Sequence, residues 1–391
     1  MREIVIVIAD LYLPAGSTDA AGGPYAAGFA GAASSRNATV SPSVGIPATP
    51  GLDHIGRFGH RRVLAGRGGW RGWLAHRLGR DDLVNVPPAV IAAEALGAAP
   101  SAPAVSGSTT SSPATSASTV WLATPLHRIA GLTSVHLDRR SLLQLSADEI
   151  QGFVADFNRV FGDDSLSAGA PTARMCLRAL PTGALLLEAP ANMVAATTDP
   201  ARALVAGLED SLPKGPQATP FKLLGAEIEM WLHPHPLNAF RARRGDLPVN
   251  ALWLWGGGPV ASVSRPELGA PASDASRLFG SDPYLAGLAR LSGIPLAPLP
   301  TAFHDFPGVA DNERTILVTE IAPVLHANPA WTVFDVIADL DRRYIAPALA
   351  TLHAGAAESL TLLVNDIELG VRRRDRLKFW RRSRSVSSVL Q

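Results

Sequence analysis

The residues best suited to chemistry lie close together between positions 233 and 258. Two histidines flank a proline there, and a basic run, an aromatic strand and three glycines follow. Alternate histidines in an extended turn have a spacing that suits zinc ligands. We favour a role for these two histidines in ending the preceding helix, and therefore predict no metal site. Glycines after a strand let backbone N–H groups approach an anion. The candidate ligand-binding residues are His233, His235, Asn238, Arg241, Asn250, Trp253, Trp255, Gly256, Gly257 and Gly258.

Asp10 is the candidate catalytic residue, at the C-terminal end of the apolar run Glu3–Ile8. Ligands of open α/β sheets bind at that edge, and a carboxylate there suits a hard cation or a substrate hydroxyl. The alternative is that Asp10 caps the element that follows. The single cysteine, Cys176, lies inside a predicted strand and is expected to be a buried, inert thiol.

The C-terminal stretch VRRRDRLKFWRRSRS interleaves basic residues with Phe379 and Trp380. Such a pattern can bind a nucleic-acid backbone or anionic lipid. The net charge of the whole chain is only +1, which lacks the basic footprint of a dedicated nucleic-acid binder. We therefore do not expect nucleic acid as a partner. A strand with one apolar and one basic face explains the interleaved pattern as well.

Strands and helices alternate around these groups. The run Glu3–Ile8 is β-branched, as expected for a strand buried on both faces of a mainly parallel sheet. Strand Thr315–Thr319, helix Val333–Leu352 and strand Leu360–Val364 form a βαβ unit that should join the first strand in one sheet. A basic strand pair from Ile367 to Arg382 is expected to close the chain. The sequence predicts an α/β fold, with a mainly parallel sheet flanked by helices.

A small α+β subdomain is predicted as an insertion in this fold. Ser146 and Glu149 form a capping box that opens the helix Ala147–Phe161, and a hairpin joins Arg174–Ala179 to Gly183–Glu188. The predicted division is an N-terminal part of the α/β domain (1–97), a disordered Ser/Ala/Pro linker (98–119), the subdomain (120–245) and a C-terminal part of the α/β domain (246–391). Residues 15–50 are expected to form a long irregular loop.

Composition fits a folded protein of the cytoplasm. The chain has 391 residues, of which 47% are hydrophobic and 18% charged, so it has ample material for a core. One cysteine excludes an internal disulfide and fits a reducing compartment. No stretch approaches the ~20 unbroken apolar residues needed to cross a membrane. We expect a cytoplasmic protein without a membrane span.

Four motifs between Trp121 and Arg382 occur in a fixed order: WLATPLHRIAG, LSADEIQGFVADFNRVFG, FKLLGAEIEMWLHPHPLNAFRARRGDLPVNALWLWGGG and RRRDRLKFWRR. In these motifs the chain resembles a proteobacterial family of RpfE-type regulatory proteins, also described as cofactor-independent phosphoglycerate mutase-like. The NALWLWGGG piece is similar to archaeal-type phosphoglycerate mutases of the alkaline phosphatase superfamily as well. This resemblance implies an alkaline phosphatase-like α/β sandwich with an inserted, lid-like subdomain.

The same resemblance implies a catalytic apparatus that the sequence matches only in part. Superfamily enzymes hold two divalent metals with Asp and His side chains and use a Ser or Thr nucleophile. Asp10 matches the first metal-binding Asp by position, but Leu11 stands where Gly is usual. Asp366 falls near the family's Asp-His pair and is followed by Ile367 instead. The Asp-x-x-x-His-x-Gly-Asp run has no counterpart, so the full shell that two-metal phosphoryl chemistry needs is missing.

The leading hypothesis is a catalytically degenerate regulatory relative of these mutases. It would bind a phosphorylated or acidic small ligand near Gly256–Gly258 and act through conformation or a regulatory protein partner. One alternative is an active phosphoglycerate mutase or phosphatase that uses Asp10 with Mn or Zn. Another is an adaptor or nucleic-acid binder working through Arg372–Arg384. Carboxylates and imidazoles converging beside the tip of the first strand would overturn the leading hypothesis.

Overall fold

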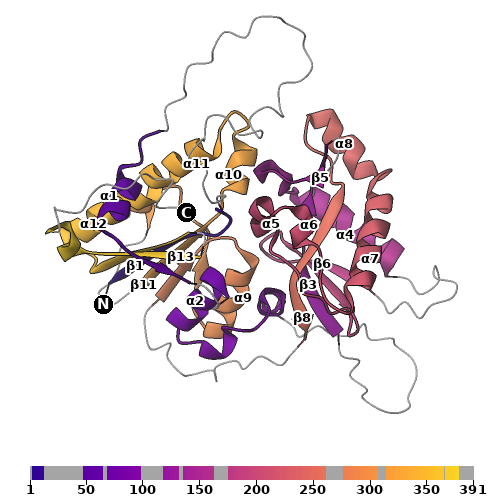
Figure 1. Ribbon diagram of the computed structural model, residues 1–391, viewed down its shortest axis with the longest axis horizontal. Coiled ribbons are helices and arrows are strands. Elements are labelled where there is room, and N and C mark those ends of the chain that lie inside the picture. The colour runs from indigo at the N-terminus through magenta and orange to yellow at the C-terminus, as the bar shows by residue number, and fades with distance from the viewer. Residues whose placement is uncertain are drawn as a thin grey trace, which may run out of the picture.

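Two β-sheets lie side by side, each with its own helices (Figure 1). The computed structural model describes residues 2–12, 47–64, 68–97, 118–131, 135–162, 175–260, 276–306, 314–364 and 366–377. Within these residues the first sheet has seven strands in the order β10-β9-β11-β1-β12-β13-β2, and the second has four in the order β6-β7-β3-β8. A two-stranded sheet pairs β4 (Ile129–Ala130) with β5 (Val135–His136).

The first sheet is mainly parallel. Its strands are β1 (Glu3–Ile8), β2 (His60–Val63), β9 (Ser276–Phe279), β10 (Leu296–Ala297), β11 (Arg314–Thr319), β12 (Ser359–Val364) and β13 (Ile367–Arg372). β10, β9, β11, β1 and β12 run parallel; at one edge β13 pairs antiparallel with β12, and β2 pairs antiparallel with β13. All six residues of β1 are buried, as a β-branched strand between two parallel neighbours should be. The predicted α/β fold with a mainly parallel sheet flanked by helices is confirmed.

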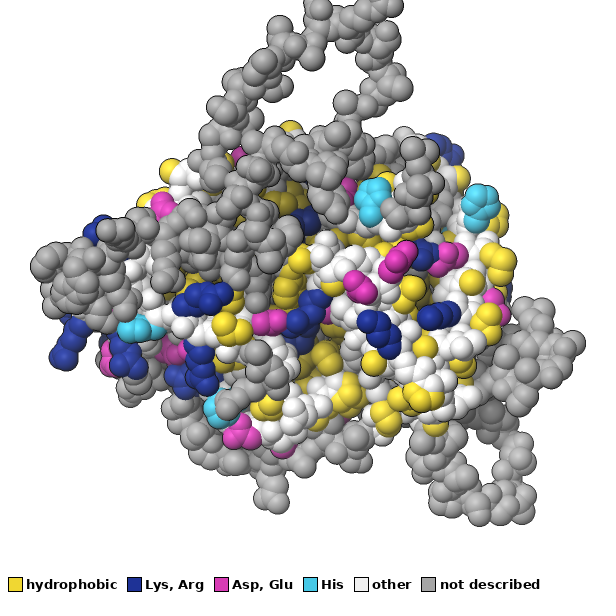
Figure 2. All heavy atoms as spheres, in the orientation of Figure 1, with side chains coloured by type: hydrophobic (Ala, Val, Ile, Leu, Met, Phe, Trp, Pro, Cys, Tyr) yellow, Lys and Arg dark blue, Asp and Glu magenta, His cyan; other side chains and the backbone are white. Residues whose placement is uncertain are grey.

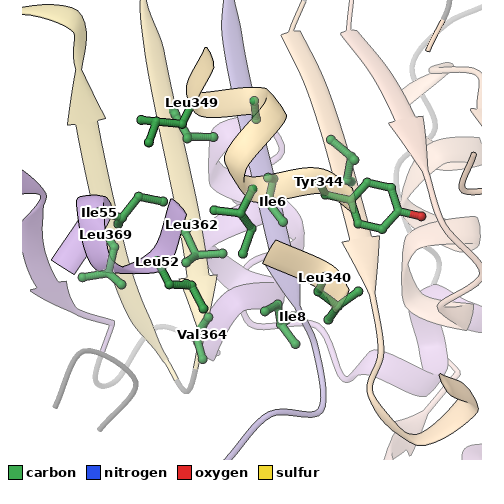
Figure 3. Close-up of a cluster of buried hydrophobic side chains, with 14 of the residues drawn as sticks. Ile6, Ile8, Leu52, Ile55, Leu340, Tyr344, Leu349, Leu362, Val364 and Leu369 are labelled. Atoms are coloured by element: carbon green, nitrogen blue, oxygen red, sulfur yellow. The ribbon is translucent and has the colours of Figure 1, made fainter. Parts of the chain in front are cut away.

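Helices cover both faces of this sheet. One face carries α1 (Pro50–Phe58), α10 (Ala322–Ala327), α11 (Val333–Leu340) and α12 (Ala346–Ala354), and the other carries α2 (Gly69–Arg77) and α9 (Pro283–Ser292). Because side chains of a strand alternate, Ile6 and Ile8 pack into the first layer while Val5 and Val7 pack into the second. Figure 3 shows the first layer, where Ile6 and Ile8 meet side chains of α1 and of the α11–α12 segment.

The predicted helix Val333–Leu352 forms, but a π-helical turn over Asp341–Ile345 interrupts it. Pro347 lies just beyond this turn and lacks the N–H that a regular α-helix would use. The carboxylate of Asp341 accepts hydrogen bonds from the N–H groups of Gly51 (3.0 Å) and Leu52 (2.7 Å). Through these two hydrogen bonds, the π-helical turn between α11 and α12 holds the first turn of α1 in place.

The second sheet is antiparallel. Its strands are β3 (Ser118–Leu126), β6 (Cys176–Ala179), β7 (Leu185–Pro190) and β8 (Ala251–Pro259). One face packs against α4 (Ala147–Phe161) and α7 (Ala218–Leu232), and the other against α3 (Pro88–Ala93). Three short helices, α5 (Pro200–Ala206), α6 (Leu208–Ser211) and α8 (Pro236–Arg244), complete this part. The predicted Ser146–Glu149 capping box and the β6–β7 hairpin are both present.

Several local predictions differ from the structure. The aromatic strand before the three glycines was predicted within the C-terminal part of the α/β domain (246–391), but it forms as β8, which hydrogen-bonds to β3 and so belongs to the second sheet. Of the predicted strand pair from Ile367 to Arg382, the first strand forms as β13, but a 3-10 helix, Arg373–Leu377, follows it in place of a turn into a second strand. Cys176 is half-buried rather than buried. Linker residues 98–117, most of the loop at 15–50, and 378–391 lie outside the described residues.

No helix within the described ranges is both long and apolar enough to cross a lipid bilayer.

Candidate ligand-binding site at the edge of the parallel sheet

A pocket of about 280 Å³ lies between the two sheets, at the carboxyl ends of the parallel strands. Three carboxylates reach it from neighbouring strands: Asp282 after β9, Glu320 after β11 and Asp10 after β1. The remaining charged lining residues are Arg71 of α2 and Asp199, the N-cap of α5. In Figure 2 basic and acidic side chains gather where the two parts of the molecule meet. This is the edge where open α/β sheets bind ligands.

Asp10 has both carboxylate oxygens occupied. Oδ1 accepts a hydrogen bond from Ile321 N (2.6 Å) and Oδ2 accepts one from Ala322 N (2.8 Å), at the start of α10. Burial raises the pKa of Asp10, while the two backbone donors and Arg139 oppose that rise. The predicted catalytic residue thus lies in the pocket, and its carboxylate caps the next helix.

Arg71 is the basic residue of the pocket. Its Nη1 lies 2.7 Å from Asp199 Oδ2 and its Nη2 lies 3.7 Å from Asp282 Oδ2. The guanidinium also stacks on two indoles, 4.6 Å from the ring centroid of Trp70 and 4.9 Å from that of Trp255. Burial lowers the pKa of Arg71, but the two carboxylates outweigh it and hold the pKa above its usual value. This side chain stays charged and ties α2 to both sides of the pocket.

Glu320 is the pocket carboxyl with no hydrogen bond from the described residues. Burial raises its pKa well above the usual range, and the neighbouring Asp282 and Asp10 raise it further. A carboxyl that keeps its proton to higher pH can donate as well as accept a hydrogen bond. Glu320 is therefore the lining group most available to a ligand.

A fourth neighbouring strand also ends in a carboxylate. Asp366 follows β12 in a left-handed backbone conformation (φ 61°), and Arg202 of α5 binds it at 2.6 Å. The Arg202 guanidinium lies 5.0 Å from the ring centroid of Tyr12. Both arginines connect the two parts of the molecule. Arg71 binds Asp282 of the first part and Asp199 of the second, whereas Arg202, from the second part, binds Asp366 of the first.

Only Asp10 and Trp255, of the predicted site residues, line this pocket. Trp255 donates its indole N–H to Thr124 Oγ1 (2.9 Å) and presents its ring to the Arg71 guanidinium. His235 instead caps α8, where its Nδ1 accepts from Leu237 N at 3.2 Å, and His233 is exposed on the surface. His233 is the C-cap of α7, in agreement with the favoured helix-ending role, whereas His235 starts the next helix instead.

The other predicted polar residues hold the second part of the molecule together. Asn238 donates to Leu232 O (2.9 Å) and Val249 O (2.8 Å), and Arg241 pairs with Glu149 at 3.0 Å. The remaining two are also bonded to the main chain: Asn250 exchanges hydrogen bonds with the backbone of Arg128, and Trp253 donates to Thr198 O. None of these four lines the pocket.

The three glycines lie within β8 rather than after a strand. The N–H of Gly256 donates to Thr197 Oγ1 (3.1 Å). A Cβ at Gly257 would lie 2.2 Å from Val120 O, and one at Gly258 would lie 3.0 Å from Pro87 Cγ. Close packing explains two of these glycines, because a side chain there would clash with the neighbouring backbone or proline.

The described residues do not supply the metal ligands implied by the mutase resemblance. They contain no group of three or more His, Cys, Asp and Glu side chains placed to hold a metal ion. Carboxylates do meet beside the tip of β1, but no histidine lines the pocket with them. A two-metal centre therefore does not fit this part of the chain, and we derive no step through one.

Asp282, Glu320, Asp199 and Arg71 were missed at the sequence level. A partial signal was available, since an acidic residue follows each of β9, β11, β1 and β12 by one to three positions. Parallel strands place those positions at one edge of a sheet. Asp199 and Arg71 gave no such signal, because they come from helices that only the tertiary fold brings to the pocket.

The sequence matches no protein-family model and no curated protein. Among solved structures, the chain is similar to the PH0037 protein from Pyrococcus horikoshii, with a TM-score of 0.39 and 13% identity over 83% of this chain and 80% of that chain. It is also similar to the cofactor-independent phosphoglycerate mutase from Thermoplasma acidophilum DSM 1728, with a TM-score of 0.35 and 17% identity over 94% of this chain and 88% of that chain. Similarity at this level carries no conclusion about ligand or activity. Fold and pocket together define an α/β protein with a charged cleft at its sheet edge.

Proposed function

We propose that this protein binds a small polar molecule in the sheet-edge pocket and acts as a catalytically degenerate, regulatory relative of phosphoglycerate mutase-like proteins. The supporting observation is that three of the four strand-end carboxylates are already bonded to other groups of the protein. Asp10 is bonded to two backbone N–H groups, Asp282 pairs with Arg71, and Asp366 pairs with Arg202. Asp10 and Asp366, which the resemblance places at or near metal-binding positions, are thus bonded to groups of the protein itself.

The charges of the pocket favour a neutral or cationic ligand over a phosphorylated one. Besides the protonated Glu320, three carboxylates line it against one guanidinium, so a phosphate would meet net repulsion. Its other wall is apolar and includes Leu122, Leu185 and the ring of Trp255. A volume of about 280 Å³ suits a small amine or hydroxyl compound whose donors bond to Glu320 and whose carbon atoms contact this wall.

Ligand charge is tested by calorimetric titration of the full chain with three probes: ethanolamine, glycerol and 3-phosphoglycerate. We expect ethanolamine to bind most tightly and 3-phosphoglycerate least. Glu320→Gln should weaken ethanolamine binding about tenfold, because the amide cannot ionise beside the bound ammonium and so accepts a weaker hydrogen bond than a carboxylate would. Glu227→Gln, on the exposed face of α7, is the matched control and should bind like the wild type. Preferential binding of 3-phosphoglycerate would restore the acidic ligand of the initial hypothesis.

The degenerate character is tested separately. Purified protein is assayed for interconversion of 3-phosphoglycerate and 2-phosphoglycerate with Mn²⁺, and its metal content is measured by elemental analysis. We expect no turnover that depends on Asp10, with Asp10→Asn as the variant because Asn keeps one oxygen to cap α10. Turnover by the wild type that Asp10→Asn abolishes, together with two tightly held Mn or Zn ions, would establish the mutase or phosphatase alternative.

A regulatory role finds support in the position of the pocket. Its lining comes from both sheets, so an occupant touches both parts of the molecule and can change how they meet. A protein partner that binds only one arrangement of the two parts would then respond to whether the pocket is occupied. The adaptor alternative rests on the exposed Arg372, Arg373 and Arg374, and binding of nucleic acid that weakens steeply with salt would support it.

A further inference from the structure

The strand β2 forms one edge of the seven-stranded sheet. It pairs with β13 on one side only, and all four of its residues are exposed. Val63 keeps 54% of its surface accessible, although valine is among the residues most often buried. Because side chains of a strand alternate, β2 presents exposed side chains on both faces of the sheet.

The pairing register shows which main-chain groups of β2 point away from the sheet. The N–H of Leu64 donates to Asp366 O (2.7 Å), so these two residues form a hydrogen-bonded pair of the antiparallel ladder. Hydrogen-bonded and non-hydrogen-bonded pairs alternate, so the pairs that Arg61 and Val63 make with β13 are of the second kind. The N–H and C=O groups of Arg61 and Val63 therefore point outward, and no hydrogen bond from the described residues reaches them.

Two other edge strands are protected. At β6, an edge of the second sheet, the side chain of Asn158 accepts from Leu177 N (2.7 Å) and donates to Leu177 O (2.9 Å). At β10, the opposite edge of the first sheet, only Leu296 and Ala297 are paired. Covering or shortening an edge is how folded proteins prevent the addition of another strand. β2 is four residues long and has no such covering side chain in the described part of the chain.

The β2 edge is basic. Exposed arginines lie on β2 and at the end of β13: Arg61, Arg62, Arg372, Arg373 and Arg374. Asp375 lies 3.5 Å from His60, which places the last three arginines beside the start of β2. The carboxylate of Asp375 also accepts from the N–H of Arg372 (2.8 Å). Glu368 of β13 accepts from Trp73 (3.1 Å) and lies 4.0 Å from Arg62. These two carboxylates are thus already paired, and arginines outnumber them at this edge.

Charge decides which strand can pair with this edge. A second copy of β2 would place arginines opposite arginines, which destabilises a strand pair. A strand with Asp or Glu opposite Arg61 and Arg62 would form pairs of opposite charge instead. A nucleic acid could bind the arginines, but it would not give the outward N–H and C=O groups the regular partners that another strand provides.

From the unpaired main chain and the basic charge we propose that β2 is the docking edge for an acidic segment of a partner protein, which adds to the sheet as an extended strand. Main-chain hydrogen bonds to Arg61 and Val63 supply affinity, and the arginines select acidic side chains. No residue of β2 lines the pocket between the two sheets, so this interaction does not depend on the proposed ligand-binding function.

Fluorescence anisotropy with the full chain tests the selection of acidic side chains. The probe is the labelled peptide Thr-Val-Glu-Glu-Val-Thr with blocked ends, and a control peptide has lysine in place of both glutamates. We expect the acidic peptide to bind about tenfold or more tightly than the basic one, by a margin that shrinks as salt is added. Equal affinities of the two peptides would refute the selection.

Val63→Pro tests the main-chain contact. Proline removes the outward N–H at this position and leaves the hydrogen bonds between β2 and β13 in place, as an edge strand allows. It should weaken binding of the acidic peptide about tenfold or more, since a main-chain hydrogen bond is lost and the ring obstructs the added strand. Val63→Thr is the matched control, because threonine is also β-branched and keeps the N–H, and it should bind like the wild type. Equal binding by Val63→Pro and Val63→Thr would overturn strand addition.

A modified peptide carries the same test if Val63→Pro does not fold. Methylation of all its main-chain nitrogens keeps the side chains but prevents pairing with β2, so this peptide should not bind measurably. Binding as tight as that of the unmethylated peptide would contradict the proposal.

Two further variants separate the charge of the edge from the charge of the whole surface. Arg61→Gln should weaken binding of the acidic peptide about threefold, whereas Arg159→Gln, at an exposed position on α4, should leave it unchanged. Single-stranded oligothymidylate is the competing probe. If it binds more tightly than the acidic peptide, and Val63→Pro does not change its affinity, the arginines serve nucleic acid and the proposal is refuted.

Discussion

The replacement Glu320→Gln tests the electrostatic description of the pocket. Gln has nearly the shape of Glu but cannot ionise, so the change removes one charge and leaves the packing in place. In the wild type, burial and the carboxylates of Asp282 and Asp10 hold the pKa of Glu320 well above its usual value. The folded chain therefore binds this proton more tightly than the unfolded chain does.

The sign of the pH effect follows from that difference. Between the unfolded pKa of about 4.3 and the raised folded pKa, the native state carries more protons, so wild-type stability falls as pH rises through this window. Above it, an ionised Glu320 without a hydrogen-bond donor costs about 1–3 kcal/mol. Glu320→Gln should be more stable than the wild type by that amount at pH 8 and by little at pH 4.5. For 391 residues at ~2.1 cal/mol/K each, this corresponds to about 1–4 °C in melting temperature.

Urea unfolding of both proteins at pH 4.5 and pH 8 provides the measurement. At each pH the free energy of unfolding of the wild type is subtracted from that of Glu320→Gln, and the values at pH 4.5 and pH 8 are then compared. This comparison cancels any change in packing introduced by the amide, because that change is the same at both pH values. Glu227→Gln, at an exposed position, should show no such pH dependence. A Glu320→Gln protein that is less stable than the wild type at pH 8, or equally shifted at both pH values, would refute the reasoning.

Three further predictions concern other parts of the structure. Arg71→Gln should destabilise the protein by about 3–5 kcal/mol in urea, since it leaves two buried carboxylates without their cation, and a loss under 1 kcal/mol would contradict the pairing. Gly257→Ala places a Cβ 2.2 Å from a backbone oxygen and should lower the free energy of unfolding by about 3 kcal/mol or more. Gly225→Ala is the control: it has open space in mid-helix and should raise the free energy of unfolding by about 0.5–1 kcal/mol. Equal melting temperatures of the two variants would show that β8 can shift to accommodate the added methyl group. Burial lowers the pKa of His326, so wild-type stability should fall relative to His326→Gln as pH drops below about 6.5, and parallel pH profiles would exclude this.

The second sheet shows how far local patterns reach. The capping box at Ser146 and the hairpin before Glu188 depend on neighbouring residues only, and both form as predicted. The aromatic strand was recognised up to the three glycines, but its continuation to Pro259 and its sheet were not, because strand pairing depends on residues more than a hundred positions away. The glycines at its end looked like an anion cradle for the same reason: nothing nearby in sequence reveals that Val120 and Pro87 pack against them.

The sequence by itself determined that β1 is a buried parallel strand with Asp10 just beyond its carboxyl end, since a β-branched run and the residues after it are local facts. The tertiary structure alone decided what Asp10 does. Its two oxygens bind N–H groups more than three hundred residues away, and the remaining charges of the pocket come from other strands and from α2 and α5. A site built at the carboxyl ends of several parallel strands collects residues that are distant in the chain, so spacing along the sequence cannot specify it.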